Sequence, residues 1–299
     1  MQKIIVTGGS GFIGTNLKSY LSQINAKFFF LDKIIPKDES HSNFEFIHCD
    51  LLNQSMVSKV LSEIKASHMI HMAWNVTPPY LNNYENFLWL KSSIHLLEEF
   101  HKNNGERILI TGSCFEYDWD YGLCQEDMTP QKHTDLYSSS KNILRHFSNS
   151  FCHYNKMELV WARLFFLYGP YENPDRFIPF IIKALLENKK AVVKNGNIYR
   201  DYMFIADTVK QLSNLLFSSF TGTINIGTGV PTKLGDLALH IGDLIGRPDL
   251  LEIQYPMEYK HKVVYADINK LINEMRIKED FEPKNGLIKT IDWWKKHLK

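Results

Sequence analysis

The chain has 299 residues, a hydrophobic fraction of 44% and a formal net charge of +1 at pH 7. This length and composition suit one large α/β domain, or one and a half, with a sizeable core, and exclude a largely disordered protein. No basic or acidic block points to a nucleic acid or a membrane surface, and the longest apolar stretch, residues 159–168, contains Arg163 and is too short to span a bilayer.

The first predicted strand, residues 3–7, begins near the N-terminus, so no signal peptide is expected, and it leads directly into a glycine turn. Glycine allows a tight turn, close approach of the backbone to a pyrophosphate, and packing of the following helix, predicted over residues 11–24, against the strand. The start of that helix offers free N–H groups and the positive end of its dipole to phosphates. The cofactor contacts expected here are Gly8, Gly11, Phe12, Ile13 and Gly14.

Asp32 follows the second predicted strand, residues 27–31, about 20 positions after the glycine turn. A carboxylate there can accept hydrogen bonds from the adenosine ribose and would repel a 2′-phosphate. Taken alone, Asp32 could simply cap a loop. In this context it predicts a dinucleotide site that favours NAD over NADP, and the neighbouring Lys33 leaves some tolerance for NADP.

Strands and helices continue to alternate through the first half of the chain. Further strands are predicted over residues 45–48, 68–71, 108–111 and 159–164, and further helices over 53–65, 84–103, 137–154, 177–187, 207–217, 234–245 and 286–297. This alternation implies an α/β fold with a doubly wound parallel sheet, a Rossmann fold. We expect residues 1–168 to bind the dinucleotide, with a later segment of about 199–230 returning to this domain, and residues 169–299 to form mainly a smaller C-terminal substrate-binding region.

The cysteines and histidines do not predict a metal site. Cys49, Cys114, Cys124 and Cys152 lack CxxC spacing and are expected to be reduced thiols of a cytoplasmic protein. His68 and His71 lie three apart on a predicted strand and therefore face opposite sides, so they cannot share one ion.

Tyr137 and Lys141 lie four residues apart at the start of a predicted helix, which places them on one face. A nearby ammonium is expected to lower the pKa of a phenol toward working pH, and Lys141 could also hold the nicotinamide ribose. Ser113 follows a strand at the carboxyl end of the predicted sheet, where its hydroxyl could donate to a carbonyl oxygen. Such a pair occurs by chance on many helices, but the preceding βα units favour a catalytic set of Ser113, Tyr137 and Lys141.

Together these features resemble the extended short-chain dehydrogenase/reductase family, in its NAD-dependent epimerase/dehydratase group, over essentially the whole chain. The resemblance rests on Gly8, Gly11 and Gly14, on Asp50-Leu-Leu52, His71-Met-Ala73, Ser113, Tyr137 and Lys141, on Arg163 with Tyr168-Gly-Pro170, and on Arg200-Asp-Tyr202 and Asn225-Ile-Gly-Thr-Gly229.

The resemblance implies an enzyme that acts on nucleotide-linked sugars with NAD. It implies that Asp50 and Leu51 lie near the adenine, Ala73 and Trp74 beside the cofactor, and Arg200 near the diphosphate of the substrate. It also implies substrate contacts for Phe166 and Arg176. Residues 169–299 would then bind mainly the nucleotide sugar, and helices 84–103 and 137–154 would build the four-helix bundle of a homodimer.

Several residues depart from the family pattern. The dehydratases carry an acid pair after the catalytic hydroxyl, where this chain has Cys114 and Phe115; Glu116 lies nearby but out of register for the acid that decarboxylases use. Phe166 stands where epimerases have asparagine. A family arginine is replaced by Met257, and Lys260 or His261 could substitute for it.

Residues 112–119, with Trp89 in place of a usual asparagine, look most like bacterial 4-keto-sugar reductases. We therefore expect an NAD(H)-dependent reductase that acts on a 4-keto-6-deoxy nucleotide sugar in bacterial deoxysugar biosynthesis. A nucleotide-sugar 4-epimerase with the same catalytic residues is the first alternative. A non-catalytic NAD-sensing protein of the same fold is the second. We expect a nucleotide-linked sugar as substrate, a homodimer, and neither nucleic acid nor membrane as partner.

Overall fold

The computed structural model describes residues 1–35, 41–256, 260–275 and 283–298. The chain divides into two compact units, and neither is one continuous stretch of sequence. Unit 1 comprises residues 1–118, 130–163 and 209–224, and unit 2 comprises residues 119–129, 164–208 and 225–299.

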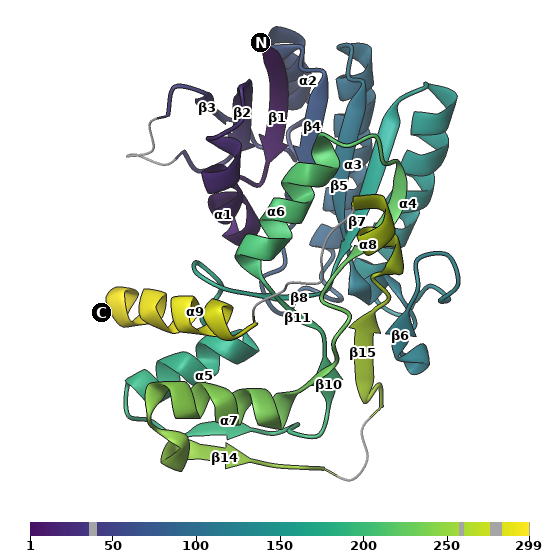
Figure 1. The fold of residues 1–299 in the computed structure, drawn as a ribbon. Coiled ribbons are helices and arrows are strands. Elements are labelled where there is room, and N and C mark those ends of the chain that lie inside the picture. Colours follow the sequence, from purple (N-terminus) through teal and green to yellow (C-terminus); the bar gives the residue numbers. More distant parts are fainter. Residues whose placement is uncertain (36–40, 257–259, 276–282, 299) are drawn as a thin grey trace. The chain divides into compact units, whose positions relative to one another are not determined.

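A seven-stranded sheet with the order β12-β7-β5-β4-β1-β2-β3 organises unit 1 (Figure 1). Its strands are β1 (Gln2–Thr7), β2 (Ala26–Asp32), β3 (Phe44–His48), β4 (His68–His71), β5 (Arg107–Ser113), β7 (Glu158–Leu164) and β12 (Gly222–Ile226). The pairs β1–β2, β2–β3, β1–β4 and β4–β5 are parallel. Because strand order reverses at β1, the expected doubly wound α/β sheet is confirmed, and its switch point lies at the glycine turn.

The helices associated with this sheet begin and end within a few residues of the predicted ranges. They are α1 (Phe12–Leu21), α2 (Gln54–Ile64), α3 (Glu85–Lys102), α4 (Leu136–Tyr154) and α6 (Ile205–Leu216). Local chemistry explains two of the starts. The Asn53 side chain accepts a hydrogen bond from the backbone N–H of Met56, and the Asp135 side chain accepts one from Ser138. The α4 cap fixes the register of the turn that carries Tyr137.

Unit 2 contains smaller sheets and three longer helices. A four-stranded sheet has the order β13-β10-β15-β6, and β11–β8 and β14–β9 form two-stranded sheets. The elements are β6 (Leu123–Cys124), β8 (Phe166–Tyr168), α5 (Phe177–Leu186), β9 (Ala191–Val193), β10 (Tyr199–Arg200), β11 (Tyr202–Phe204), β13 (Thr232–Lys233), α7 (Leu234–Ile245), β14 (Leu251–Ile253), β15 (Val263–Ala266), α8 (Asn269–Met275) and α9 (Pro283–His297).

Asp201 connects the segments of unit 2. One carboxylate oxygen accepts the backbone N–H and the hydroxyl of Thr228, at 2.8 and 2.6 Å. The other accepts the N–H groups of Gly229 and Ala266, at 3.0 and 3.1 Å. This fully buried side chain therefore binds the loop after β12 and the end of β15 to the strand region at residues 199–204.

The state of the cysteines and the character of the helices were also predicted from the sequence. All four cysteines are buried and free of disulfides. Among the residues that the structure describes, no helix has both the length and the apolar character that a membrane crossing needs.

Candidate functional site

A cavity of about 570 Å³ in unit 1 lies at the glycine turn. Gly8 has a φ of +74°, and a Cβ atom there would lie 2.9 Å from the backbone nitrogen of Ala73. A Cβ atom on Gly14 would lie 2.3 Å from the carbonyl oxygen of Gly8. Both positions therefore require glycine, and the turn leaves room for a ligand beside Gly8 and Ala73, which line the cavity.

Asp32 also lines this cavity, and its position relative to the glycine turn is fixed by Ser10. The Asp32 Oδ2 atom accepts hydrogen bonds from the Ser10 backbone N–H at 3.0 Å and from the Ser10 hydroxyl at 2.6 Å. A carboxylate at the end of β2, next to a turn of this kind, suits the ribose of a dinucleotide. The residues present therefore fit an NAD adenosine.

Lys33 lines the same cavity, but its ammonium lies 3.1 Å from Asp50 Oδ2. Asp50 does not line the cavity: its Oδ1 atom accepts the N–H of Leu52 at 2.9 Å, while Leu51 and Leu52 form the wall. Of the proposed adenine contacts, Leu51 thus faces the cavity and Asp50 supports the wall. The ion pair also occupies the Lys33 ammonium, the positive charge that could otherwise bind the 2′-phosphate of NADP.

Other predicted cofactor residues support the cavity without lining it: Gly11, Phe12, Ile13, Gly14 and Trp74. The first four form the cap and first turn of α1. Sequence reasoning did not assign the lining residues Ser10 and Trp89 to the cofactor. Ser10 could have been found, since it lies inside the glycine turn. Trp89 lies in α3, and its role depends on tertiary packing.

Ser113, Tyr137 and Lys141 come together in unit 1, as predicted. Tyr137 is 6% exposed, and its hydroxyl is hydrogen-bonded to the side chain of Ser113. Lys141 donates from Nζ to the carbonyl oxygen of Thr111 at 3.0 Å, and its Nζ atom lies 4.0 Å from the centroid of the Trp74 ring. The end of β5 and the first turns of α4 therefore hold a hydroxyl, a phenol and an ammonium in one buried cluster.

The electrostatics of this cluster differ from the sequence expectation. Burial raises the pKa of Tyr137 well above its ordinary value, and the hydrogen bond from Ser113 only partly opposes this effect. Burial also lowers the pKa of Lys141 to about 7, against the opposing charge of Glu116. The expected lowering of the phenol pKa by Lys141 is therefore wrong for this arrangement, because desolvation by burial is the largest effect on Tyr137 and raises its pKa.

The turn after Ser113 contains no acid directed at the phenol. Cys114 is 2% exposed, and the ring of Phe115 lies 6.1 Å from the ring of Tyr137. Glu116 is fully buried, and its Oε2 atom accepts a hydrogen bond from Arg163 Nε at 2.7 Å. The residues that replace the dehydratase acid pair are thus an apolar ring and a packed thiol, and the nearby Glu116 is committed to an ion pair.

In unit 2, Arg200 lies in an aromatic cluster. Its guanidinium carbon is 5.2 Å from the Trp119 ring centroid and 5.7 Å from that of Phe166. Its Nη1 atom donates to the carbonyl oxygens of Tyr199 and His261 at 2.7 and 3.1 Å. Two of the predicted substrate residues, Phe166 and Arg200, are therefore neighbours, and Trp119 joins them.

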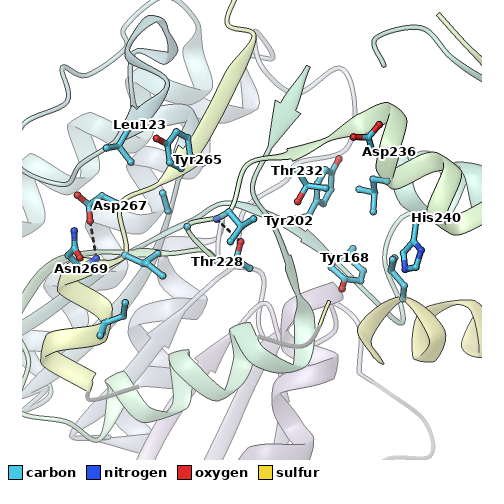
Figure 2. A pocket seen from close by; sticks show the side chains of 17 residues that line it. Leu123, Tyr168, Tyr202, Thr228, Thr232, Asp236, His240, Tyr265, Asp267 and Asn269 are labelled. Carbon is cyan, nitrogen blue, oxygen red and sulfur yellow. Dashed lines mark hydrogen bonds between the residues drawn. The ribbon is translucent and has the colours of Figure 1, made fainter. Parts of the chain in front are cut away.

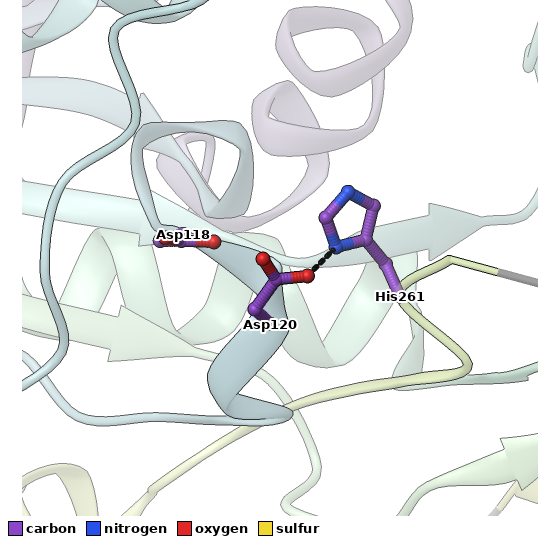
Figure 3. Close-up of side chains that lie close together, drawn as sticks. All are labelled: Asp118, Asp120 and His261. Carbon is purple, nitrogen blue, oxygen red and sulfur yellow. Dashed lines mark ion pairs between the residues drawn. The ribbon is translucent and has the colours of Figure 1, made fainter.

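His261 lies beside this cluster and pairs with Asp120 (Figure 3). The Nδ1 atom of His261 is 2.8 Å from Asp120 Oδ1, and its ring centroid is 6.1 Å from that of Trp119. Met257 lies outside the described residues, and Lys260 is exposed. Of the two residues that could replace the family arginine, His261 is the one that contacts the aromatic cluster.

Arg176, the third predicted substrate residue, is half-buried at the N-cap of α5. Its charge acts on Glu172, which is 9% exposed. Burial raises the pKa of Glu172 to about 8, and the charge of Arg176 opposes this effect.

A second cavity, of about 760 Å³, lies within unit 2 (Figure 2). Asp236 and His240 of α7 line one part of its wall, and Tyr265 and Asp267 line another. None of the predicted substrate residues lines this cavity, although Tyr202, two residues after Arg200, does. Sequence reasoning treated Tyr202 only as part of a motif.

Comparisons with known proteins find relatives and solved structures that match this chain over nearly its whole length. The chain is 23% identical to the dTDP-D-glucose 4,6-dehydratase of Bos taurus, over 99% of this chain and 90% of that protein. It is similar in fold to the UDP-N-acetylglucosamine 4-epimerase of Methanobrevibacter ruminantium, with a TM-score of 0.88, 23% identity, and coverage of 99% and 98% of the two chains. It is also similar to the UDP-glucose 4-epimerase of Thermus thermophilus in complex with NAD, with a TM-score of 0.86, 20% identity, and coverage of 99% and 100%.

These similarities at low identity establish the fold. A family model establishes which protein family the chain belongs to. The model of the NAD dependent epimerase/dehydratase family matches residues 4–227, which include the glycine turn, Ser113, Tyr137 and Lys141. The protein is therefore an enzyme of the NAD dependent epimerase/dehydratase family, whose cofactor is NAD.

Proposed function

We propose that the protein is an NAD(H)-dependent reductase that converts the ketone of a 4-keto-6-deoxy nucleotide sugar into an alcohol. The observation that carries this proposal is the combination of a Ser113–Tyr137–Lys141 cluster with a turn that offers no acid for dehydration. Cys114 and Phe115 cannot move protons at two sugar carbons, and Glu116 is held by Arg163.

In the proposed mechanism, bound NADH supplies the hydride. Tyr137 donates its phenolic proton to the ketone oxygen, and the Ser113 hydroxyl donates a hydrogen bond to the same oxygen as charge develops. Lys141 stabilises the phenolate that remains. Because burial raises the pKa of Tyr137, the phenol is protonated at neutral pH, which suits a proton donor in a reduction.

For the substrate, we propose that Arg200 binds the diphosphate and that Phe166 and Trp119 form an apolar wall beside it. A guanidinium suits bidentate contact with phosphate oxygens, and flanking aromatic rings hold its plane in place. Arg176 is assigned a second contact with the nucleotide sugar. A bulky Phe166 wall would restrict rotation of the sugar and so favour one fixed pose.

The 4-epimerase remains the second candidate, because related proteins of the family carry that activity and would use the same residues. One experiment separates the two. Purified protein is incubated with NADH and dTDP-, CDP-, GDP- or UDP-linked 4-keto-6-deoxy sugars. We expect stoichiometric loss of the NADH absorbance. Tightly copurified NAD, a 4-epimer product and constant NADH absorbance would instead establish the epimerase.

The Tyr137→Phe variant tests whether the cluster is catalytic at all. Removing only the hydroxyl should lower the rate at least about 1,000-fold, since the proton donor is lost, while NADH affinity stays within about two-fold. Tyr154→Phe, on an exposed tyrosine of the same helix, is the matched control and should behave as wild type. If Tyr137→Phe kept full turnover, the assigned donor would be wrong; if neither variant nor wild type turned over any sugar, the NAD-sensing alternative would gain support.

We also propose a cytoplasmic homodimer in which α3 and α4 of two copies meet. Phe87 and Leu88 of α3 and Ile143 of α4 are exposed by 51, 37 and 52%, so a second copy could cover these apolar side chains. Light scattering should give twice the mass of the 299-residue chain, and Phe87→Glu combined with Ile143→Glu should give the monomer. A monomeric wild type would contradict this assembly.

A further inference from the structure

Glu116 is a buried carboxylate in the turn that follows the proposed catalytic residue Ser113. Its side chain is 0% exposed and lies in the short 3₁₀ turn η1 (Cys114–Glu116), directly after Ser113. Taking a carboxylate out of water is expensive, and a buried ion pair is often no more stabilising than apolar residues of similar volume. The presence of this pair beside Ser113 therefore calls for a local explanation.

The contacts of Glu116 divide between its two oxygens. Oε1 accepts the backbone N–H of Ser113 at 2.8 Å, and Oε2 accepts Nε of Arg163 at 2.7 Å. Both oxygens also lie within 3.1 Å of the Trp161 indole nitrogen. A Cβ atom on Gly112 would lie 2.4 Å from Oε1, so the residue before Ser113 must be glycine for the carboxylate to reach. The carboxylate thus fixes the backbone of Ser113 against β7.

We propose that Glu116 is a positioning residue, which holds Ser113 through its backbone N–H and sets a buried carboxylate beside the Ser113–Tyr137–Lys141 cluster. This inference rests on the proposed function, because it acts through the cluster assigned there. It gives Glu116 a role other than moving substrate protons, since both of its oxygens are occupied by protein donors.

The electrostatic half of the proposal follows from the charges around the cluster. The negative charge of Glu116 opposes the effect of burial on Lys141, and so favours the ammonium form. It also favours the neutral phenol of Tyr137. The other charged or titratable groups around the cluster include Tyr80 and Cys114, which act on Tyr137, and His71, which faces Lys141. They also include Arg163 and Arg145, which lie against Glu116, and Tyr117, which acts on Arg163. Among them, the guanidinium groups of Arg163 and Arg145 lie 2.7 and 4.0 Å from Glu116 Oε2.

Two substitutions separate charge from position. Glu116→Gln keeps the length of the side chain and an acceptor for Ser113, but removes the charge. Glu116→Asp keeps the charge and withdraws it by one methylene from the Ser113 N–H. The control is Glu158→Gln, which removes the carboxylate paired with Arg107 at the opposite end of β7.

The first readout is NADH affinity, measured by quenching of tryptophan fluorescence from pH 6 to pH 10. We expect the affinity of wild type to fall through a midpoint as Lys141 loses its proton, and Lys141→Met to abolish that midpoint. Glu116→Gln should move the midpoint down by about one pH unit, because the ammonium loses its favourable neighbour. Glu116→Asp and Glu158→Gln should leave it within a few tenths of a unit.

The second readout is amide hydrogen exchange at Ser113. Glu116→Asp should speed this exchange at least about tenfold, because the N–H loses its acceptor. An unmoved midpoint in folded Glu116→Gln, with Lys141→Met behaving as expected, overturns the electrostatic role. Unchanged exchange in Glu116→Asp overturns the positioning role. If Glu116→Gln does not fold, the exchange rate in Glu116→Asp alone tests the proposal. A midpoint that persists in Lys141→Met instead contradicts the proposed function.

Discussion

The two units each contain a fully buried carboxylate, and they stabilise it by different means. Glu116 in unit 1 pairs with a cation, with Arg163 Nε at 2.7 Å, in addition to the Ser113 and Trp161 N–H groups that it accepts. Asp201 in unit 2 is balanced by dipoles, since its oxygens accept three backbone N–H groups and one hydroxyl. The comparison indicates that a charge beside the proposed chemistry is compensated by another charge, whereas a charge that joins chain segments is compensated by backbone groups.

The largest expected effect comes from breaking the ion pair of unit 1. Arg163→Met leaves Glu116 buried without its close cation and should lower the free energy of unfolding by about 3–5 kcal/mol. Urea denaturation measures this change. The control is Lys189→Met, which breaks the pair with Glu187 at 2.6 Å on an exposed lysine, and should cost no more than about 1 kcal/mol. Equal losses in both variants would remove the distinction between buried and exposed pairs.

Breaking the dipole-stabilised carboxylate should have a somewhat smaller effect. Asp201→Asn places an NH₂ group against backbone donors, which removes two of the four hydrogen bonds and should cost about 2–4 kcal/mol. Hydrogen exchange at Gly229 and Ala266, or at Thr228, should rise in this variant. Asp175→Asn, at an exposed position of the same unit, is the control. A stability equal to wild type would show that the carboxylate is not needed to join the segments of unit 2.

Glu172 is a third buried acid, and burial has a larger effect on its pKa than the nearby charge of Arg176. Its folded pKa is raised to about 8 from 4.5, chiefly by burial, so between these values the folded protein binds more protons than the unfolded one. Stability from this group is complete below pH 4.5 and is lost as the pH rises through about 8. Glu172→Gln should therefore raise the free energy of unfolding at pH 9 relative to wild type by about 2 kcal/mol, with little change at pH 4.5. Parallel curves of stability against pH would contradict this.

The smallest effect is expected at the exposed pair of Lys33 and Asp50. We expect wild type to bind NADH at least about tenfold more tightly than NADPH, because Asp32 meets the 2′-phosphate with like charge. Lys33→Ala should change this ratio by less than about threefold, since its ammonium is already engaged at 3.1 Å by Asp50. Titration of both cofactors measures the ratio. Equal affinities in wild type would show that Asp32 does not face the ribose.

Much of the fold followed from local sequence signals. The glycine turn predicted where the sheet reverses, and apolar strands alternating with helices predicted the doubly wound sheet. The four-residue spacing of Tyr137 and Lys141 placed them on one face of α4, and Ser113 joins them as expected. These features depend on residues close together in the chain, where helix period, strand period and glycine conformation act directly.

Contacts between distant residues, and the effects of burial, were decided only by the tertiary structure. Glu116 meets Arg163 across 47 positions, and Asp201 meets Ala266 across 65. Neither spacing carries a periodic signal. The grouping of residues 119–129 with unit 2 also depends on contacts between residues that are distant in the chain. The pKa of Tyr137 gives the physical reason: the sequence shows which charge is nearby, but the sign of the shift depends on how much solvent the folded chain removes, and here desolvation by burial is the larger effect.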